Sequence, residues 1–259
     1  MLQTATREVA PNNLARFANA VQAAQPATAN SSCSNCCLQS VCLPRGVSAT
    51  RMAEFNQLAT VKRRIPRGVA VYRAGEPFDS VYAVRSGAFK SVGVSSNGVE
   101  KITGFFLPGE VMGLDAINNE HHDYSAIALE DSEVCAIPFA RLAELSLRIP
   151  ELQQELFRLL SRDITRDQGL MLLLGSMTAE QRLAAFLLSL SRRYQRLGYA
   201  ADRFVLRMTR EDIGNYLGLT LETVSRLMSR FQREGLLAAQ QREVALTNSD
   251  GLHRIVGQW

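Results

Sequence analysis

Long apolar runs are missing from this sequence of 259 residues. No uninterrupted stretch approaches the roughly 18–20 apolar residues that are needed to span a bilayer. The first 30 residues carry Arg7, Glu8 and Arg16 and show no continuous apolar segment ahead of a cleavage-like site. We therefore expect no membrane span, no signal peptide and a cytoplasmic location, where thiols stay reduced.

Net charge is also small. The chain has 29 Lys plus Arg against 25 Asp plus Glu, which gives a formal net charge of +4. This balance excludes a histone-like polycation, although a local basic patch would suffice to bind nucleic acid. Hydrophobic residues make up 46% of the chain, which is enough to bury ordinary cores. The length predicts two domains rather than one.

Cysteine is scarce, and its count is odd. Four of the five cysteines lie within ten residues, as Cys33, Cys36, Cys37 and Cys42, and Cys135 follows about a hundred residues later. An odd count in a chain of this size argues against a disulfide scaffold. The spacing C-x2-C-x5-C also lacks the second C-x2-C pair of an ordinary zinc site, and the three histidines are not spaced to replace it.

Three thiolates from one loop and one from a distant strand suit a cluster that is ligated on several corners. Soft thiolates are compatible with zinc or iron–sulfur, and the spacing favours iron–sulfur only modestly. A reduced loop without metal stays open at this point. An iron–sulfur enzyme is not expected, because the sequence shows no nucleophile–base pairing, no phosphate-cradling glycine loop and no histidine placed for acid–base work.

The middle of the chain has the pattern of a β-domain. Short runs of β-branched and aromatic residues are punctuated by glycines, which predicts a compact sandwich or barrel. The expected strands cover residues 69–72, 80–84, 88–94, 102–106 and 134–137.

A long helix is expected from Pro150 to about Gly175. Its apolar residues are spaced alternately three and four positions apart, and one position of this stripe is occupied by the acidic residue Asp167. Such a heptad stripe pairs with a second copy of itself, although an amphipathic helix lying on its own domain would show a similar pattern. The residues of the expected dimer interface are Phe157, Leu160, Ile164, Asp167 and Met171.

A second helical domain is expected after residue 177. Thr178 and Gln181 form a capping-box signature at its start. A strand is expected at 204–208 and a small wing strand at 244–246. Between them, Thr209 caps a short helix, Gly218 marks a turn and Thr220 caps a second helix. This is a helix-turn-helix pattern.

The second of these helices presents polar side chains on one face. Glu222, Ser225 and Arg226 lie at offsets 0, 3 and 4, and Ser229 and Arg233 extend the same face. Arginine donates two bonds to guanine, glutamate accepts from cytosine, and serine does either, so the face suits the major groove. The alternative is an ordinary solvated helix face on which Glu222 and Arg226 form an ion pair.

These features together resemble the CRP/FNR family of bacterial regulators, and within it the oxygen-sensing FNR type. The resemblance covers about residues 33–250 and is carried by Cys33-x2-Cys36-x5-Cys42-Leu43-Pro44, by residues 134–138 and by residues 213–227. It implies an α+β fold with a cyclic-nucleotide-binding-like β-roll, a long dimerisation helix and a winged helix-turn-helix. The corresponding division is a poorly ordered leader at 1–32, a sensor domain at 33–149, the helix at 150–176 and a DNA-binding domain at 177–259.

The resemblance also implies a function. Cys33, Cys36, Cys42 and Cys135 would ligate an oxygen-labile [4Fe-4S] cluster, and Cys37, which departs from the family pattern, would be a bystander. The alternative is that the thiol of Cys37 alters the sensitivity of the cluster to oxygen. Glu222, Ser225 and Arg226 would contact a palindromic site like TTGAT-N4-ATCAA. The cluster would promote a homodimer that mainly activates, and also represses, genes of anaerobic metabolism. The alternative is a zinc- or dithiol-based redox regulator of the same fold.

Two further expectations concern partners. In the family, a loop that corresponds to residues 95–100 touches RNA polymerase, although an inert turn is equally compatible with the sequence. Cyclic-nucleotide sensors of the family hold the phosphate with an arginine, whereas this chain reads Gly113-Leu114-Asp115 and has no Arg or Lys between Lys101 and Arg141. We therefore expect no cyclic nucleotide.

Overall fold

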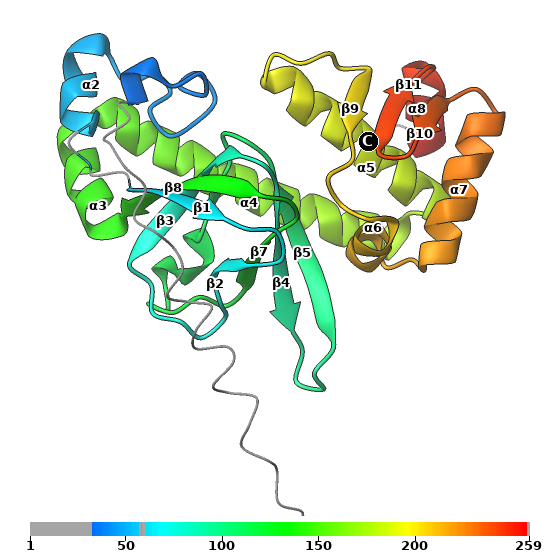
Figure 1. Ribbon diagram of the computed structural model, residues 1–259, viewed down its shortest axis with the longest axis horizontal. Helices are drawn as coiled ribbons and strands as arrows, with labels where there is room; N and C mark the ends of the chain where they lie inside the picture. Colours follow the sequence, from blue (N-terminus) through cyan, green and yellow to red (C-terminus); the bar gives the residue numbers. More distant parts are fainter. Residues whose placement is uncertain (1–32, 57, 59–60, 258–259) are drawn as a thin grey trace, which may run out of the picture.

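The computed structural model describes residues 33–56, 58 and 61–257. The expected leader at 1–32 lies outside the described residues. The remainder forms a β-domain and a helical domain, and helix α4 (Pro150–Ser176) extends from one to the other (Figure 1). In this described part, no helix is both long and apolar enough to cross a membrane. The arrangement confirms the predicted α+β fold.

The β-domain consists of two antiparallel four-stranded sheets. Their strand orders are β1-β8-β3-β6 and β2-β7-β4-β5. The five runs expected from the sequence all contain strands, and β1, β6 and β7 are additional. The strand bounds are β1 (Val61–Ile65), β2 (Ala70–Tyr72), β3 (Ser80–Ser86), β4 (Phe89–Val94), β5 (Glu100–Phe106), β6 (Val111–Met112), β7 (Ser125–Ala128) and β8 (Ser132–Pro138).

Strand β3 is buried on both faces because it lies between two cores. Tyr82 and Val84 point into the core between the sheets. Val81 and Ala83 point the other way, into a second core. Side chains alternate along a strand, so one strand serves both cores. The second core is closed by α2 (Ala49–Asn56), α3 (Phe139–Arg148), the start of α4 and the cysteine-bearing segment that precedes α2.

Helix α4 has 27 residues and is therefore about 40 Å long. Pro150 occupies its first turn, where the missing N–H costs nothing. Leu152 and Leu159 are buried in the second core, so one end of the helix is anchored to the β-domain. The predicted start at Pro150 is confirmed.

The C-terminal domain is a winged helix-turn-helix. Two of its helices begin with complete capping boxes, at Thr178 with Gln181 and at Thr209 with Asp212, and the first of these was predicted. The strand expected at 204–208 is wrong in part, since only its beginning is extended. The elements are α5 (Ala179–Arg196), β9 (Arg203–Val205), α6 (Arg210–Leu217), α7 (Leu221–Arg233), β10 (Leu237–Gln240), β11 (Glu243–Leu246) and α8 (Ser249–Val256).

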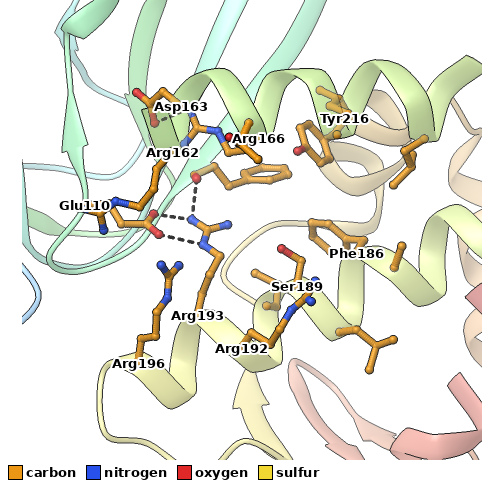
Figure 2. A pocket seen from close by; sticks show the side chains of 18 of the residues that line it. Glu110, Arg162, Asp163, Arg166, Phe186, Ser189, Arg192, Arg193, Arg196 and Tyr216 are labelled. Atoms are coloured by element: carbon orange, nitrogen blue, oxygen red, sulfur yellow. Dashed lines mark hydrogen bonds and ion pairs between the residues drawn. The ribbon is translucent and has the colours of Figure 1, made fainter. Parts of the chain in front are cut away.

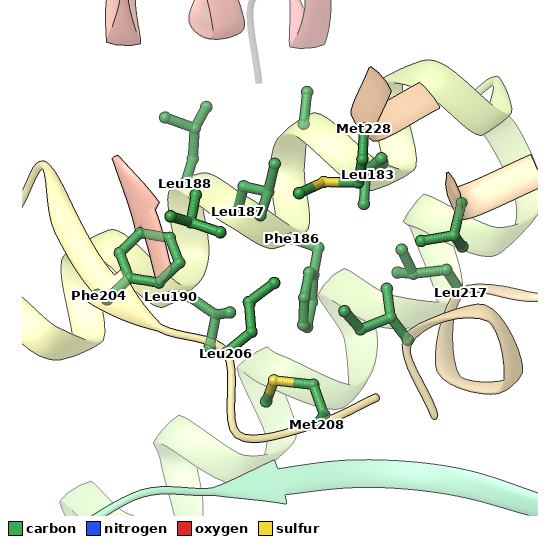
Figure 3. Packing of buried hydrophobic residues seen from close by; sticks show 14 of the residues in the cluster. Leu183, Phe186, Leu187, Leu188, Leu190, Phe204, Leu206, Met208, Leu217 and Met228 are labelled. Carbon is green, nitrogen blue, oxygen red and sulfur yellow. The ribbon is translucent and has the colours of Figure 1, made fainter. Parts of the chain in front are cut away.

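The residues that follow β9 contribute to the core of this domain although they are not paired with another strand. Leu206 and Met208 follow β9 and point into the hydrophobic cluster beneath α5 (Figure 3). Phe186 lies at the centre of the same cluster and contacts Tyr216 of α6, with ring centroids 5.9 Å apart. Phe204, Leu206 and Met208 are buried alternately, as in a strand, but the pairing with β11 ends at Val205, which lies opposite Glu243, the first residue of β11.

The two helices of the helix-turn-helix approach each other most closely at Gly214. A Cβ atom on Gly214 would lie 2.7 Å from the carbonyl oxygen of Leu219, which is too close for any real side chain. The N–H of Leu219 also donates to the carbonyl of Gly214 at 2.8 Å. The turn between α6 and α7 therefore requires glycine here.

We expect Gly214→Ala to lower the free energy of unfolding by roughly 1–3 kcal/mol, because the added methyl group overpacks the turn. Gly169→Ala on α4 is the matched control, since nothing lies within 4 Å of the added Cβ. That control should raise stability by up to about 1 kcal/mol, since alanine is the better helix former. Denaturant unfolding measures both, and equal effects would show that the packing of α6 on α7 has been misassigned.

The helix-turn-helix also docks on the β-domain. Asn215 of α6 accepts a hydrogen bond from the N–H of Ile102 at 2.7 Å and donates to the carbonyl of Glu100 at 3.0 Å. Lys90 of β4 lies 2.7 Å from the carboxylate of Asp212. Burial opposes ionisation of Asp212, but the bonds from Lys90 and Thr209 outweigh it and lower the pKa of this carboxyl. The helix-turn-helix domain is thus held by β4 and β5 of the β-domain.

Candidate DNA interface and cysteine cluster

Helix α7 has one buried side and one open side. Val224, Leu227 and Phe231 are buried against the rest of the helix-turn-helix. Of the expected DNA-contacting residues, Glu222 and Arg226 are exposed and Ser225 is half-buried. All three lie on the open side, as their spacing predicted, and α7 forms one outer edge of the molecule (Figure 1).

The charged side chains among the expected DNA-contacting residues are not neutralised by other residues of the described chain. Among the described residues, neither Glu222 nor Arg226 takes part in an ion pair, so the two do not form the bridge that an ordinary solvated face would allow. Bonds from its own backbone N–H and the Thr220 hydroxyl lower the pKa of Glu222. This carboxylate is therefore ionised at neutral pH and fits a hydrogen-bond donor such as the cytosine amino group.

The stripe expected at the dimer interface lies on the open side of α4. Phe157, Ile164 and Met171 are 62%, 57% and 67% exposed, and Leu160 is half-buried. Large apolar side chains are rarely this exposed in a row unless another surface covers them. Asp167 interrupts the row, and its carboxylate lies 3.7 Å from the guanidinium of Arg166.

Three of the four cysteines expected to act as ligands, Cys33, Cys42 and Cys135, pack against the same core. Cys135 lies on β8 between Val134 and Ala136, which point between the sheets, so its side chain points to the opposite face. Cys33 and Cys42 pack against that same face, in the core that α2, α3 and α4 close. The cysteine-bearing segment is a series of tight turns, and the Asn56 side chain accepts a hydrogen bond from the N–H of Cys33 at 2.8 Å.

The thiols are close enough to influence one another electrostatically. Burial, together with the neighbouring Cys135 and Cys36, raises the pKa of Cys33 to about 11. Burial likewise raises the pKa of Cys42 to about 12, with added contributions from Cys135, Cys33 and Cys36. Cys37 is exposed and is absent from these interactions. The spatial grouping therefore separates four cysteines from the fifth.

The donor chemistry of this group fits a soft metal, because four thiols from two parts of the chain converge on one face. In the part of the chain that is described, however, no three His, Cys, Asp or Glu side chains are arranged as a metal-binding group. The fit therefore rests on the kind of donor and on the shared location, and not on ligand geometry.

Comparison with known proteins assigns the family. Residues 62–148 match the cyclic nucleotide-binding domain family, and residues 181–255 match the Crp-like helix-turn-helix domain family. The transcriptional regulatory protein Btr of Bordetella pertussis is 51% identical over 226 residues, which cover 87% of this chain and 93% of Btr. The chain belongs to the CRP/FNR family.

Other members of this family are similarly close. The transcriptional activator protein Anr of Pseudomonas aeruginosa is 45% identical, with 87% of this chain and 92% of Anr covered. The fumarate and nitrate reduction regulatory protein of Salmonella typhimurium is 44% identical, with coverage of 87% and 90%. Among solved structures, FixK2 from Bradyrhizobium japonicum matches with a TM-score of 0.72 at 33% identity, over 78% of this chain and all of FixK2. This CRP/FNR protein is a DNA-binding transcription regulator of the FNR/Anr type and not an enzyme.

Sequence reasoning missed the residues that join the two domains. Asn215 and Asp212 lie in the helix-turn-helix, but their partners Glu100, Ile102 and Lys90 lie more than a hundred residues earlier. No periodicity or motif marks such a pairing.

Proposed function

We propose that this regulator responds to oxygen through a [4Fe-4S] cluster held by Cys33, Cys36, Cys42 and Cys135. The observation that carries the proposal is that Cys33, Cys42 and Cys135 pack against one core, with Cys36 close enough to influence all three electrostatically and Cys37 exposed. A cluster bound there would supply an oxygen-labile centre. The protein would regulate genes of anaerobic metabolism, mainly as an activator and also as a repressor.

The chain connects the cysteines to the dimer helix by direct packing. Leu43 follows Cys42 and is completely buried in the same core as Leu152 and Leu159 of α4. A change in the cysteine-bearing segment therefore displaces side chains that support α4. Interiors are close-packed, so such a displacement alters the position of the helix rather than being absorbed locally.

The open stripe of α4 supports a homodimer as the DNA-binding form. Two copies related by a two-fold axis would cover Phe157, Leu160, Ile164 and Met171 of each chain. The paired α7 helices would then meet two half-sites of a palindrome such as TTGAT-N4-ATCAA, with Glu222, Ser225 and Arg226 at the bases. We place this activity in the cytoplasm, where the DNA is.

RNA polymerase is the second macromolecular partner that we propose. The β4–β5 hairpin carries Val94 and Val99 at its tip, 59% and 58% exposed. The turn between them is ordered by the Ser95 hydroxyl, which donates to the carbonyl of Val99 at 2.9 Å. An ordered tip with exposed apolar side chains suits a protein contact.

A cyclic nucleotide is not part of the proposal. Asp115 stands where the family's ribose-binding carboxylate would be expected, and its carboxylate accepts hydrogen bonds from the backbone N–H groups of Asp123 and Tyr124. It is therefore engaged by the chain itself. The sequence from 102 to 140 also offers no cation to pair with a phosphate.

The decisive experiment is an absorbance spectrum of protein purified without oxygen, followed during exposure to air. Specific DNA binding is measured on the same samples. We expect the iron–sulfur absorbance and the specific binding to decline together. Zinc in the anaerobic protein, the absence of any metal, or DNA binding that is unchanged after the absorbance is lost would contradict the proposal and favour a zinc- or dithiol-based regulator.

Arg226→Ala tests the base contacts. We expect the affinity for the palindrome to fall by about 5- to 150-fold, which corresponds to about 1–3 kcal/mol for a lost guanine contact. Binding to random DNA should change little. Arg148→Ala, on α3, removes an exposed arginine outside the helix-turn-helix and serves as the control. Equal weakening on both DNAs would show that Arg226 contacts phosphate instead.

A further inference from the structure

Two adjoining cavities lie where the β-domain, α4 and the DNA-binding domain meet. The larger has a volume of about 940 Å³ and is bounded by α4, by α5 and by the turn that follows β5 (Figure 2). The smaller has a volume of about 320 Å³ and is bounded in addition by the segment from Ser40 to Arg45. They share the lining residues Gly109, Glu110, Arg162, Arg193 and Arg196.

The cysteine-bearing segment closes the smaller cavity tightly. Gly109 has a φ of +83°, and a Cβ there would lie 2.8 Å from a methyl carbon of Val41. Arg45 is tied to the same segment, since its N–H donates to the carbonyl of Cys42 at 2.9 Å. The wall that carries Arg45 is therefore a continuation of the cysteine loop.

The cavities carry a large positive surplus. Six arginines and two carboxylates line them, so their formal surplus of four positive charges equals the net charge of the whole chain. Those arginines are Arg45, Arg162, Arg166, Arg192, Arg193 and Arg196.

Three of these arginines already have carboxylate partners. Arg193 donates from Nε to Glu110 at 2.9 Å, Arg166 lies 3.2 Å from Asp163, and Arg162 lies 2.5 Å from a carboxylate oxygen of the buried Glu155. Within the described residues, no ion pair or side-chain hydrogen bond engages the other three. These are Arg45, Arg192 and Arg196.

The electrostatic environment of Arg196 reflects this surplus. Burial lowers its pKa, and although Glu110 opposes the effect, the charges of Arg162, Arg193 and Arg192 lower it further. Figure 2 shows the side chains of Arg162, Arg193 and Arg196 converging beside Glu110. Like charges held this close together in a partly enclosed site repel one another, and a bound anion relieves the repulsion.

We propose that the junction is a binding site for a small phosphate-bearing anion, held by Arg45 and Arg196 with Arg162 beside them. The planar guanidinium group of arginine matches two phosphate oxygens at once. The volumes of the cavities are those of ordinary small-ligand sites. The larger cavity adds an aromatic wall of Phe105, Phe186 and Tyr216, which would accommodate an organic group attached to the phosphate.

A ligand at this position would bridge the two halves of the regulator. Arg45 belongs to the cysteine-bearing segment, whereas Arg196 is the last residue of α5 in the DNA-binding domain. The anion would therefore stabilise the docked arrangement of the domains. None of the cysteines lines either cavity, but Ser40, Val41 and Arg45 of the cysteine-bearing segment do.

The test is calorimetric titration of the full-length protein with inorganic phosphate and, separately, with a nucleoside triphosphate, at constant ionic strength maintained with chloride. We expect saturable binding of at least one probe, and the tighter of the two identifies the source of the phosphate. Arg45→Gln and Arg196→Gln should each weaken that binding by about tenfold or more, because each removes a charge-assisted pair. Arg64→Gln, an exposed arginine of β1, is the matched control and should leave binding unchanged.

Three results would overturn the proposal. The first is the absence of saturable binding above the chloride background. The second is an equal loss of binding in Arg64→Gln, which would indicate a general charge effect. The third is that Arg45→Gln and Arg196→Gln leave phosphate binding intact but weaken binding to random DNA, which would assign these arginines to the DNA backbone.

Discussion

Replacement of Cys33, Cys36, Cys42 or Cys135 by serine, one at a time, should abolish the iron–sulfur absorbance of protein purified without oxygen. A [4Fe-4S] cluster is held by four thiolates, and a serine hydroxyl is a much poorer donor to iron. The same four variants should also lose specific DNA binding in the absence of oxygen. Iron content, visible absorbance and gel-shift assays on the same preparations measure these effects.

Cys37→Ser is the matched control, because Cys37 lies in the same segment but is exposed and stands outside the electrostatic grouping of the other four thiols. It should retain both the absorbance and the DNA binding. Far-UV circular dichroism of each variant separates loss of a ligand from loss of the fold. Retention of the absorbance in Cys135→Ser, or its loss in Cys37→Ser alone, would refute the assignment of ligands.

Local sequence signals predicted most of the helices that carry the site. Thr178, Thr209 and Thr220 each accept a hydrogen bond from a backbone N–H at the start of a helix, so the three boundaries follow from cap chemistry. The open face of α7 likewise followed from its helical spacing. These are interactions between residues three or four positions apart, which a sequence displays directly.

Elements whose stability comes from elsewhere in the fold were missed. Strand β1 contains three consecutive basic residues at Lys62, Arg63 and Arg64, and it is extended because it pairs with β8 at a sheet edge. Helix α8 contains Gly251, which weakens the helical pattern. A Cβ at Gly251 would lie 2.5 Å from a Leu236 methyl carbon, so glycine there lets the helix pack closely against the residue that precedes β10. In both cases the partner is distant in sequence.

The arrangement of the functional site also depends on contacts between residues that are distant in sequence. The sequence singled out Cys135 by its residue type, but only the alternation along β8 shows that it faces Cys33 and Cys42. The docking of α6 on β5 through Asn215, and the arginine-rich junction, had no sequence signal at all. Both arise from contacts between domains, and neither domain alone specifies them.

Asp167→Ala should produce specific DNA binding in air. Asp167 interrupts the exposed apolar row of α4 between Ile164 and Met171, and 63% of its side chain is exposed. Its one ion-pair partner in the described chain is the adjacent Arg166, 3.7 Å away. In a two-fold dimer this carboxylate would approach its own copy, so like charges would weaken the association.

Removal of the two charges should strengthen the dimer by at least about tenfold, and an alanine also extends the apolar stripe. The Asp167→Ala protein would then dimerise without a cluster bound to the cysteines. Asp163→Ala is the matched control: it removes a carboxylate from the same helix, but one that faces the cavity and pairs with Arg166 at 3.2 Å. Sedimentation and gel-shift assays in air measure the outcome. An Asp167→Ala protein that stays monomeric and inactive in air would show that Asp167 lies at the edge of the interface and does not control it.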